Sequence, residues 1–189
     1  MKIFIVVILI TLIAVSASHA FALSLQGEGE ARPDHPSIAA AGTSSPANLC
    51  LYEIVVKTAP GIENGGTDAR IYLKLSGADE RDAMEFPDLE SWGWMGPGHD
   101  YFESGNMDIF GQAPRACMAA MPCRMLLASD GSSGRPDWYV NFVEVIQIDT
   151  GLSVLVRKFF INGWLSASMP PYQLFAYQDL CGSNNTEVA

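Results

Sequence analysis

Residues 66–76 read GTDARIYLKLS and place a glycine-led polar turn directly before an alternating segment. Ile71, Leu73 and Leu75 point to one side of this segment, and the residues between them point to the other. Strict alternation of this kind predicts a strand over residues 70–76 with one buried face. Gly65 precedes the turn, and two successive glycines allow backbone dihedrals that other residues rarely adopt.

Short apolar stretches of the same kind recur along the chain, and turn residues separate them. In residues 51–57, Tyr52, Ile54 and Val56 share one face. Further strands are predicted over residues 106–110, 124–129, 138–148, 152–160 and 172–178, with a β-bulge near Val143. Few segments carry a helical period, so the chain is predicted to form an all-β fold, an antiparallel β-sandwich.

Further motifs follow the GTDA turn in order. Residues 89–103 read LESWGWMGPGHDYFE, residues 105–110 read GNMDIF, residues 137–145 read DWYVNFVEV and residues 160–165 read FINGWL. Together they resemble the PLAT domain, the β-sandwich attached to lipoxygenases and animal lipases. The stretch from 89 to 110 also resembles small secreted plant proteins that consist of one PLAT domain and are linked to stress responses. The resemblance implies two four-stranded antiparallel sheets.

The first part of the chain reads as a targeting segment. Residues 1–22 contain Lys2, an apolar run too short for a comfortable membrane span, and small residues at a cleavage site. An uncleaved anchor is the alternative, which those small residues disfavour. Residues 23–48 are predicted to form a flexible arm, residues 49–181 the PLAT domain and residues 182–189 a polar tail. The predicted location is the secretory pathway, with the protein secreted, extracellular or in the lumen of the endoplasmic reticulum.

The acidic charge balance of the chain limits the kinds of partner that it can bind. Removal of residues 1–22 takes away Lys2 and no acid, so 10 basic and 21 acidic residues remain. Phosphate repels such a chain, which argues against nucleic acid and against purely electrostatic docking on anionic lipid. Contact with a membrane would need exposed apolar side chains or a bridging cation.

Four cysteines remain after the targeting segment, and an even count in an oxidising compartment predicts disulfides. Four cysteines allow three pairings, and the sequence alone does not choose among them. First and last strands are neighbours in the fold that the chain resembles, which favours Cys50–Cys181 and Cys117–Cys123. Zinc is the alternative, disfavoured because the chain has no Cys-x-x-Cys motif or nearby histidine.

The reactive side chains argue against an enzyme. His99 is the only histidine in the predicted domain, and residues 131–134, GSSG, lack the spacing of a nucleophile elbow. The sequence contains no HExxH motif, phosphate-binding loop or dinucleotide fingerprint. The chain therefore resembles the accessory domain of lipoxygenases and lipases without their catalytic domain. No small-molecule substrate is predicted, and the protein is expected to be a monomer.

Calcium is the cofactor that the resemblance implies. In calcium-binding PLAT domains the metal lies between the Gly-Thr-Asp loop and an acidic residue before the Trp-Tyr strand. The matching positions are Gly66, Thr67, Asp68 and Asp137, and Asn64 could add an oxygen. Six to eight oxygen ligands are typical, so backbone carbonyls and waters would supply the rest. The alternative is that Asp68 caps a turn and Asp137 merely begins a strand.

The loops that insert into lipid in this family carry aromatic residues, and here those loops have none. The apolar, glycine-rich segment with Trp92, Trp94 and Met95 is instead predicted to contact a membrane lipid surface or a partner protein. Trp138 and Trp164 are predicted to lie in the core. The predicted function is a lipid-surface or protein-binding module assisted by calcium. A structural or signalling interaction domain without lipid contact is the alternative.

The polar tail contains one further motif. Asn184-Asn185-Thr186 is a glycosylation sequon, so Asn184 is a candidate glycan site in a secreted chain.

Overall fold

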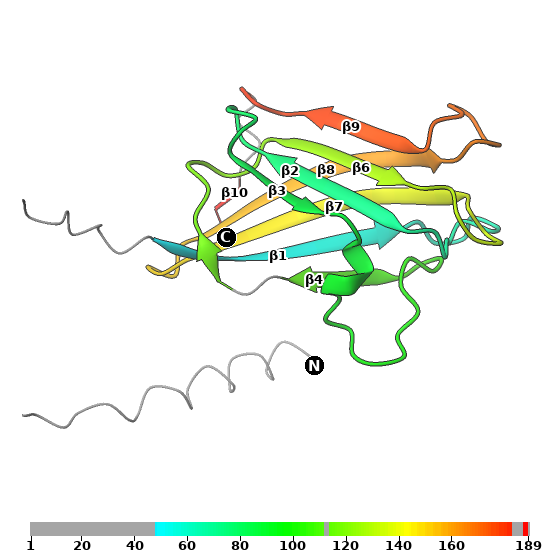
Figure 1. Cartoon of the computed structure of the whole chain (residues 1–189), viewed down its shortest axis with the longest axis horizontal. Helices are drawn as coiled ribbons and strands as arrows, with labels where there is room; N and C mark the ends of the chain where they lie inside the picture. The colour runs from blue at the N-terminus through cyan, green and yellow to red at the C-terminus, as the bar shows by residue number, and fades with distance from the viewer. Residues whose placement is uncertain (1–47, 112–113, 183–186, 189) are drawn as a thin grey trace, which may run out of the picture. The chain divides into compact units, whose positions relative to one another are not determined.

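Apolar side chains at alternate positions build two antiparallel sheets, and the all-β sandwich prediction is confirmed (Figure 1). The computed structural model describes residues 48–111, 114–182 and 187–188. Sheet A contains β1 (Leu49–Thr58), β4 (Met107–Gly111), β7 (Trp138–Asp149) and β8 (Val154–Leu165) in the order β8-β7-β1-β4. The two-residue strands β5 (Arg115–Ala116) and β10 (Glu187–Val188) pair with β1 and β8.

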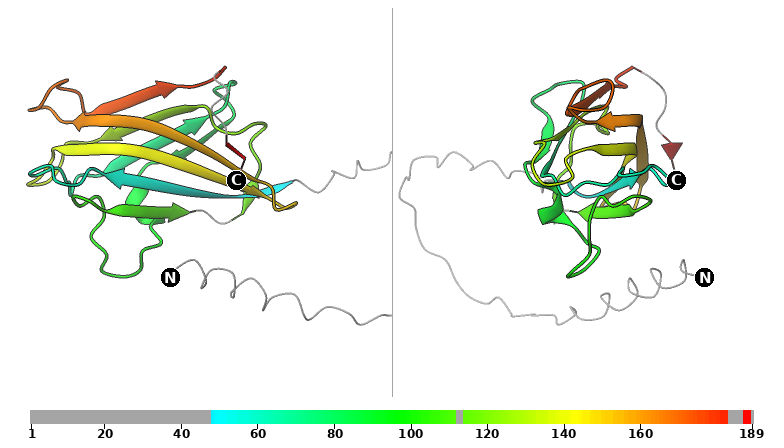
Figure 2. Two further views of the ribbon diagram at one scale, coloured as in Figure 1. Left: turned by 180° about the vertical axis from the view of Figure 1, so that it is seen from behind. Right: turned by 90° about the vertical axis from the view of Figure 1, so that its right-hand side faces the viewer.

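Sheet B contains β2 (Ile71–Ser76), β3 (Ala83–Phe86), β6 (Arg124–Ser129) and β9 (Phe175–Asp179) in the order β3-β2-β6-β9. Apart from β5 and β10, each sheet therefore has the four strands that the resemblance implies, although β3 was not among the strands predicted from the sequence. A short 3-10 helix, η2 (Leu89–Trp92), leads from sheet B towards β4. Figure 2 shows the two sheets stacked as layers, with the core between them.

The inward faces of the two sheets form one apolar core. The predicted face of β1 is confirmed, because Tyr52, Ile54 and Val56 are all buried. Trp138 is fully buried as predicted, and its ring lies edge-on to Phe102 at a centroid distance of 5.0 Å. The largest side chains of this core are Trp138, Tyr52, Phe86, Phe102, Phe110 and Phe159.

The predicted strand boundaries are accurate for β2, β6 and β7, whereas β9 begins at Phe175, after the predicted start at residue 172. β8 continues to Leu165, beyond the predicted end at residue 160, because it pairs with β7 as far as Trp138. The register shift in β7 lies between Val140 and Phe142, directly before Val143, so the predicted β-bulge near this residue is confirmed. Trp164 is half-buried on the outer face of sheet A against Tyr139, so the prediction that it lies in the core was wrong.

The disulfide pairing differs from the prediction. Cys50 is bonded to Cys117 and Cys123 is bonded to Cys181, with 4.9 Å between the Cα atoms of each pair. The predicted pairs Cys50–Cys181 and Cys117–Cys123 are therefore wrong. The physical reason is that β1 and β9, the first and last of the strands predicted from the sequence, lie in different sheets. Cys50 lies opposite β5 in sheet A, and Cys117 follows β5 directly. Cys123 precedes β6 and Cys181 follows β9, and these two strands pair in sheet B.

Four loops meet at the end of the sandwich where β1 finishes and β2, β4, β7 and β9 begin. We call this the loop end; it lies at the right in Figure 1. It contains residues 59–70, 100–106, 130–137 and 166–174. Within the described residues, no helix has the length and apolar character needed to cross a bilayer. The predicted targeting segment, most of the arm and Asn184 lie outside the described residues.

Candidate functional site

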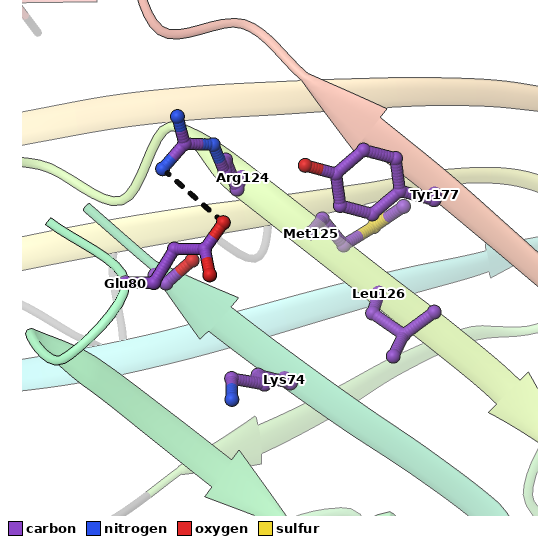
Figure 3. A pocket seen from close by; sticks show the side chains of 7 residues that line it. Lys74, Glu80, Arg124, Met125, Leu126 and Tyr177 are labelled. Atoms are coloured by element: carbon purple, nitrogen blue, oxygen red, sulfur yellow. Dashed lines mark ion pairs between the residues drawn. The ribbon is translucent and has the colours of Figure 1, made fainter. Parts of the chain in front are cut away.

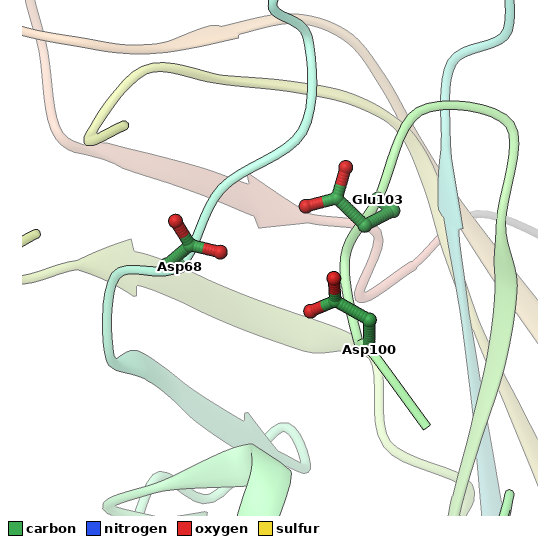
Figure 4. A group of neighbouring side chains, drawn as sticks. All are labelled: Asp68, Asp100 and Glu103. Atoms are coloured by element: carbon green, nitrogen blue, oxygen red, sulfur yellow. The ribbon is translucent and has the colours of Figure 1, made fainter. Parts of the chain in front are cut away.

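Three carboxylates converge at the loop end. Asp68 comes from the loop between β1 and β2, while Asp100 and Glu103 come from the loop between η2 and β4. One carboxylate oxygen from each residue lies within 4.8 Å of the others (Figure 4). We call this group the acidic cluster. Carboxylate oxygens are the ligands that calcium prefers, so the donor set fits a hard cation.

Arg135, from the loop between β6 and β7, balances part of the acidic cluster. Its guanidinium donates hydrogen bonds of 3.1 and 3.2 Å to Asp68, and of 2.9 and 3.3 Å to Glu103. The hydrogen bonds to Asp68, followed by the charges of Glu103 and Asp68, raise the pKa of the Arg135 guanidinium. All three side chains are partly exposed. Solvent therefore screens these ion pairs, and each contributes little to stability.

Gly66 and Thr67 hold the loops of the acidic cluster close together. A methyl group at Gly66 would lie 3.0 Å from the Glu103 Cα atom, a contact so tight that the two loops would have to move slightly apart. The buried Thr67 hydroxyl donates to the carbonyl of Arg135 at 2.8 Å. The structure therefore places both residues beside the cluster, with Thr67 tying two loops together. Asn64 adopts a left-handed conformation in the preceding turn, at a φ of 53°.

The structure does not bring Asp137 into the acidic cluster. Its carboxylate accepts hydrogen bonds from the hydroxyls of Ser166 and Ser168, which lie on the loop between β8 and β9. The Ser168 bond measures 2.6 Å, and Ser166 is buried. Asp137 thus fixes that loop to the start of β7. Sequence reasoning placed Asp137 with Asp68, and it named neither Glu103 nor Arg135 as part of the site.

Trp92, Trp94 and Met95 lie on the flank of the sandwich, beside the edge strand β4. All three side chains are exposed, and Trp94 is the most exposed at 56%. The Trp94 amide donates to the carbonyl of Ile109 at 2.8 Å, and its ring covers Gly111, where a methyl group would lie 2.6 Å from the ring. These contacts place Trp94 along β4 and away from the strand's first residue at the loop end.

His99 forms a structural pair with a buried acid. Its Nε2 atom lies 2.6 Å from Oδ1 of Asp108, whose side chain is fully buried. The other oxygen of Asp108 accepts the amide N–H of Phe102 at 2.7 Å. The ring of His99 also lies edge-on to Tyr101. Together these contacts fix the long loop that carries two members of the acidic cluster.

A shallow depression lies on the outer face of sheet B (Figure 3). Its volume is about 130 Å³, and small-molecule sites usually begin near ~300 Å³. Arg124 at its rim is already held by Asp179 at 2.8 Å. We assign no ligand to this depression. Its lining residues are Lys74, Ser76, Glu80, Arg124, Met125, Leu126 and Tyr177.

Fold and site together define a β-sandwich domain whose candidate site is built from loops at one end. The chain is 34% identical over 151 residues to PLAT domain-containing protein 2 of Arabidopsis thaliana, covering 77% of this chain and 78% of that protein. It is 37% identical over 134 residues to PLAT domain-containing protein 1 of the same plant, with coverage of 70% and 72%. The chain therefore belongs to the PLAT domain-containing proteins.

Other comparisons are more distant. No protein-family model matches the chain. Among solved structures, coral 8R-lipoxygenase, described as activated by calcium via a C2-like domain, aligns with a TM-score of 0.48 and 24% identity. The alpha toxin of Clostridium absonum aligns with a TM-score of 0.47 and 19% identity. The alignments cover 68% and 74% of this chain, and 16% and 33% of those proteins.

Proposed function

We propose that this chain is a non-enzymatic module that docks on a phospholipid surface with the help of calcium. The observation that supports this function is the acidic cluster, in which two loops far apart in sequence bring Asp68, Asp100 and Glu103 together. Backbone carbonyls, waters and lipid phosphate would complete the six to eight oxygens that calcium requires. Calcium would bridge the cluster to phosphate and offset the repulsion between an acidic protein and an anionic surface.

Calcium must compete with Arg135 for the cluster. The guanidinium occupies oxygens of both Asp68 and Glu103, so these carboxylates would have to release it to ligate a metal. Exposed ion pairs are weak and lose strength in salt, so a divalent cation can displace one. The released guanidinium would then be free to pair with a phosphate oxygen.

Vesicle sedimentation with and without calcium tests the proposal. Calcium should increase binding to vesicles of four parts phosphatidylcholine and one part phosphatidylserine, and it should raise the melting temperature of the free protein. Asp68→Asn combined with Asp100→Asn should remove both effects, because two ligand charges are lost. Two further exposed acids, Glu80 and Glu90, lie outside the cluster and provide the charge-matched control Glu80→Gln with Glu90→Gln. A calcium response that survives in the cluster variant would contradict the proposal.

We further propose that the module enters the secretory pathway and leaves it as a monomer. The proposed division is residues 1–22 as signal, 23–48 as arm, 49–181 as domain and 182–189 as tail, with a glycan on Asn184. Both disulfides of the described residues fit an oxidising compartment. Expression in a secreting cell, followed by mass spectrometry of the released protein, would read the first residue, the glycan and the mass together.

Protein binding without lipid contact is the second candidate. The exposed Trp94 and Met95, with Trp92 beside them, favour it because tryptophan and methionine are enriched at protein interfaces. Their place along the flank of β4 would let a partner bind without covering the acidic cluster. Trp94→Ala distinguishes the two roles. Unchanged vesicle binding by this variant would favour a protein partner for the patch, and weakened vesicle binding would show that the patch contacts lipid.

A further inference from the structure

Beyond the acidic cluster, we infer that the loop between β8 and β9 carries the apolar contact with the phospholipid bilayer. This inference rests on the function proposed above and adds the residues that enter the bilayer interface. We call residues 167–172, which read ASMPPY, the apolar tip. Every residue of the apolar tip is exposed.

The segment around the apolar tip has an unusual composition for this chain. Residues 159–178 contain no Asp, Glu, Lys, Arg or His, although the whole chain has 21 acidic and 11 basic residues. Tyr172 is 65% exposed and Met169 is 38% exposed. The segment contributes these exposed large apolar side chains: Phe160, Met169, Tyr172, Phe175 and Tyr177. They lie on β8, on β9 and on the loop that joins them.

The apolar tip is held in place by the polar groups beneath it. Asp137 accepts hydrogen bonds from Ser166 and Ser168, and Ser166 Oγ in turn accepts the amide N–H of Met169 at 2.8 Å. The amide of Tyr172 donates to the carbonyl of Met169, also at 2.8 Å. Hydrogen bonds therefore fix the loop while its apolar side chains remain exposed. A contact that is already ordered loses less conformational entropy on binding.

The apolar tip and the acidic cluster lie at the same end of the sandwich. Figures 1 and 2 show the loop after β8 beside the loop before β7 in two views. The short segment between Arg135 and Asp137 connects the two features, because Arg135 pairs with the cluster and Asp137 anchors the tip loop. One surface that covers the loop end can therefore meet both features.

A phospholipid bilayer offers both chemistries at once. Its phosphates suit a calcium ion held by the cluster, and its interface suits an uncharged loop that ends in a tyrosine. The absence of charge on the tip disfavours a ligand recognised through ion pairs. The apolar tip also supplies what the loops around Gly66 and Arg135 lack, since neither of those has an aromatic residue.

The experiment compares two variants at opposite ends of the sandwich. Tyr172 and Leu152 are both exposed and both adopt left-handed backbone conformations, with φ values of 63° and 64°. Asparagine tolerates this conformation, so Tyr172→Asn and Leu152→Asn are matched changes. Met169→Gln is combined with Tyr172→Asn to make the tip variant. Neither change removes a side-chain hydrogen bond that holds the loop.

The tip variant should bind phosphatidylcholine–phosphatidylserine vesicles in calcium about tenfold less tightly, because two large apolar side chains no longer enter the interface. It should keep the parent's melting temperature and its calcium shift in the absence of vesicles. Leu152→Asn should bind vesicles as the parent does. Parent-like binding by the tip variant, or an equal loss in Leu152→Asn, would overturn the inference while leaving the calcium-assisted function intact.

Two other outcomes would also overturn it. A parent protein that binds no vesicles, with or without calcium, would refute the proposed function and this inference together. Sedimentation velocity tests the remaining alternative, in which a second copy of the chain binds the apolar tip. A parent dimer that the tip variant converts to a monomer, with vesicle binding unchanged, would assign the apolar tip to self-association.

Discussion

Trp138→Ala should strongly destabilise the folded domain, whereas Trp94→Ala should leave the fold intact. Trp138 is fully buried, and its Nε1–H donates a 3.0 Å hydrogen bond to the buried hydroxyl of Thr58. Removing a buried tryptophan side chain lowers the free energy of unfolding by about 3–5 kcal/mol, and leaving the hydroxyl unpaired adds about 1–3 kcal/mol. The sum is a large part of the ~5–15 kcal/mol that stabilises a typical domain.

Urea unfolding followed by circular dichroism measures these losses. Trp94→Ala should change the free energy of unfolding by less than ~1 kcal/mol, because the side chain is mostly exposed. Trp138→Phe keeps most of the apolar volume and isolates the hydrogen bond. Adding Thr58→Val should then recover stability, since no unpaired hydroxyl remains. A loss below ~2 kcal/mol for Trp138→Ala, or an equal loss for Trp94→Ala, would refute this assignment of core and surface.

Three further changes have defined outcomes. Replacing Cys50 and Cys117 together by alanine opens a loop with a sequence separation of 67 and should lower the free energy of unfolding by about 4 kcal/mol, read from urea curves. Gly66→Ala should push the Glu103 loop away and weaken the calcium-dependent shift in melting temperature. Arg135→Gln should raise calcium affinity in calorimetry, because the competing cation is gone; a lower affinity would mean that Arg135 supports the site.

The sequence predicts what depends on local periodicity. β6 matches its predicted bounds at both ends, and β2 differs by one residue, because alternation alone defines a strand with one buried face. The buried face of β1 and the core position of Trp138 follow from the same pattern. β3, a four-residue strand, carries too short a pattern to be recognised before its pairing with β2 is known.

The sequence predicts less well what depends on neighbours in space. The cysteine pairs require knowledge of which strands share a sheet, and the resemblance alone led to the wrong choice. Asp137 was correctly placed before a strand, yet the direction of its carboxylate is decided by serines about thirty residues further along the chain. Glu103 could have been considered from its acidic, glycine-rich surroundings in the sequence.

Arg135 also bears on how strongly the acidic cluster should bind calcium. Three carboxylates without a counter-ion would repel one another, and the guanidinium relieves that repulsion in the metal-free protein. Calcium would gain only the difference between its own attraction to the cluster and that of Arg135, so its affinity should be modest. Extracellular calcium modules bind with dissociation constants of ~10⁻⁴–10⁻³ M, and this is the range in which titrations should begin. A phospholipid surface that adds phosphate oxygens and buries the apolar tip would raise the apparent affinity, so calcium and lipid should each strengthen the binding of the other.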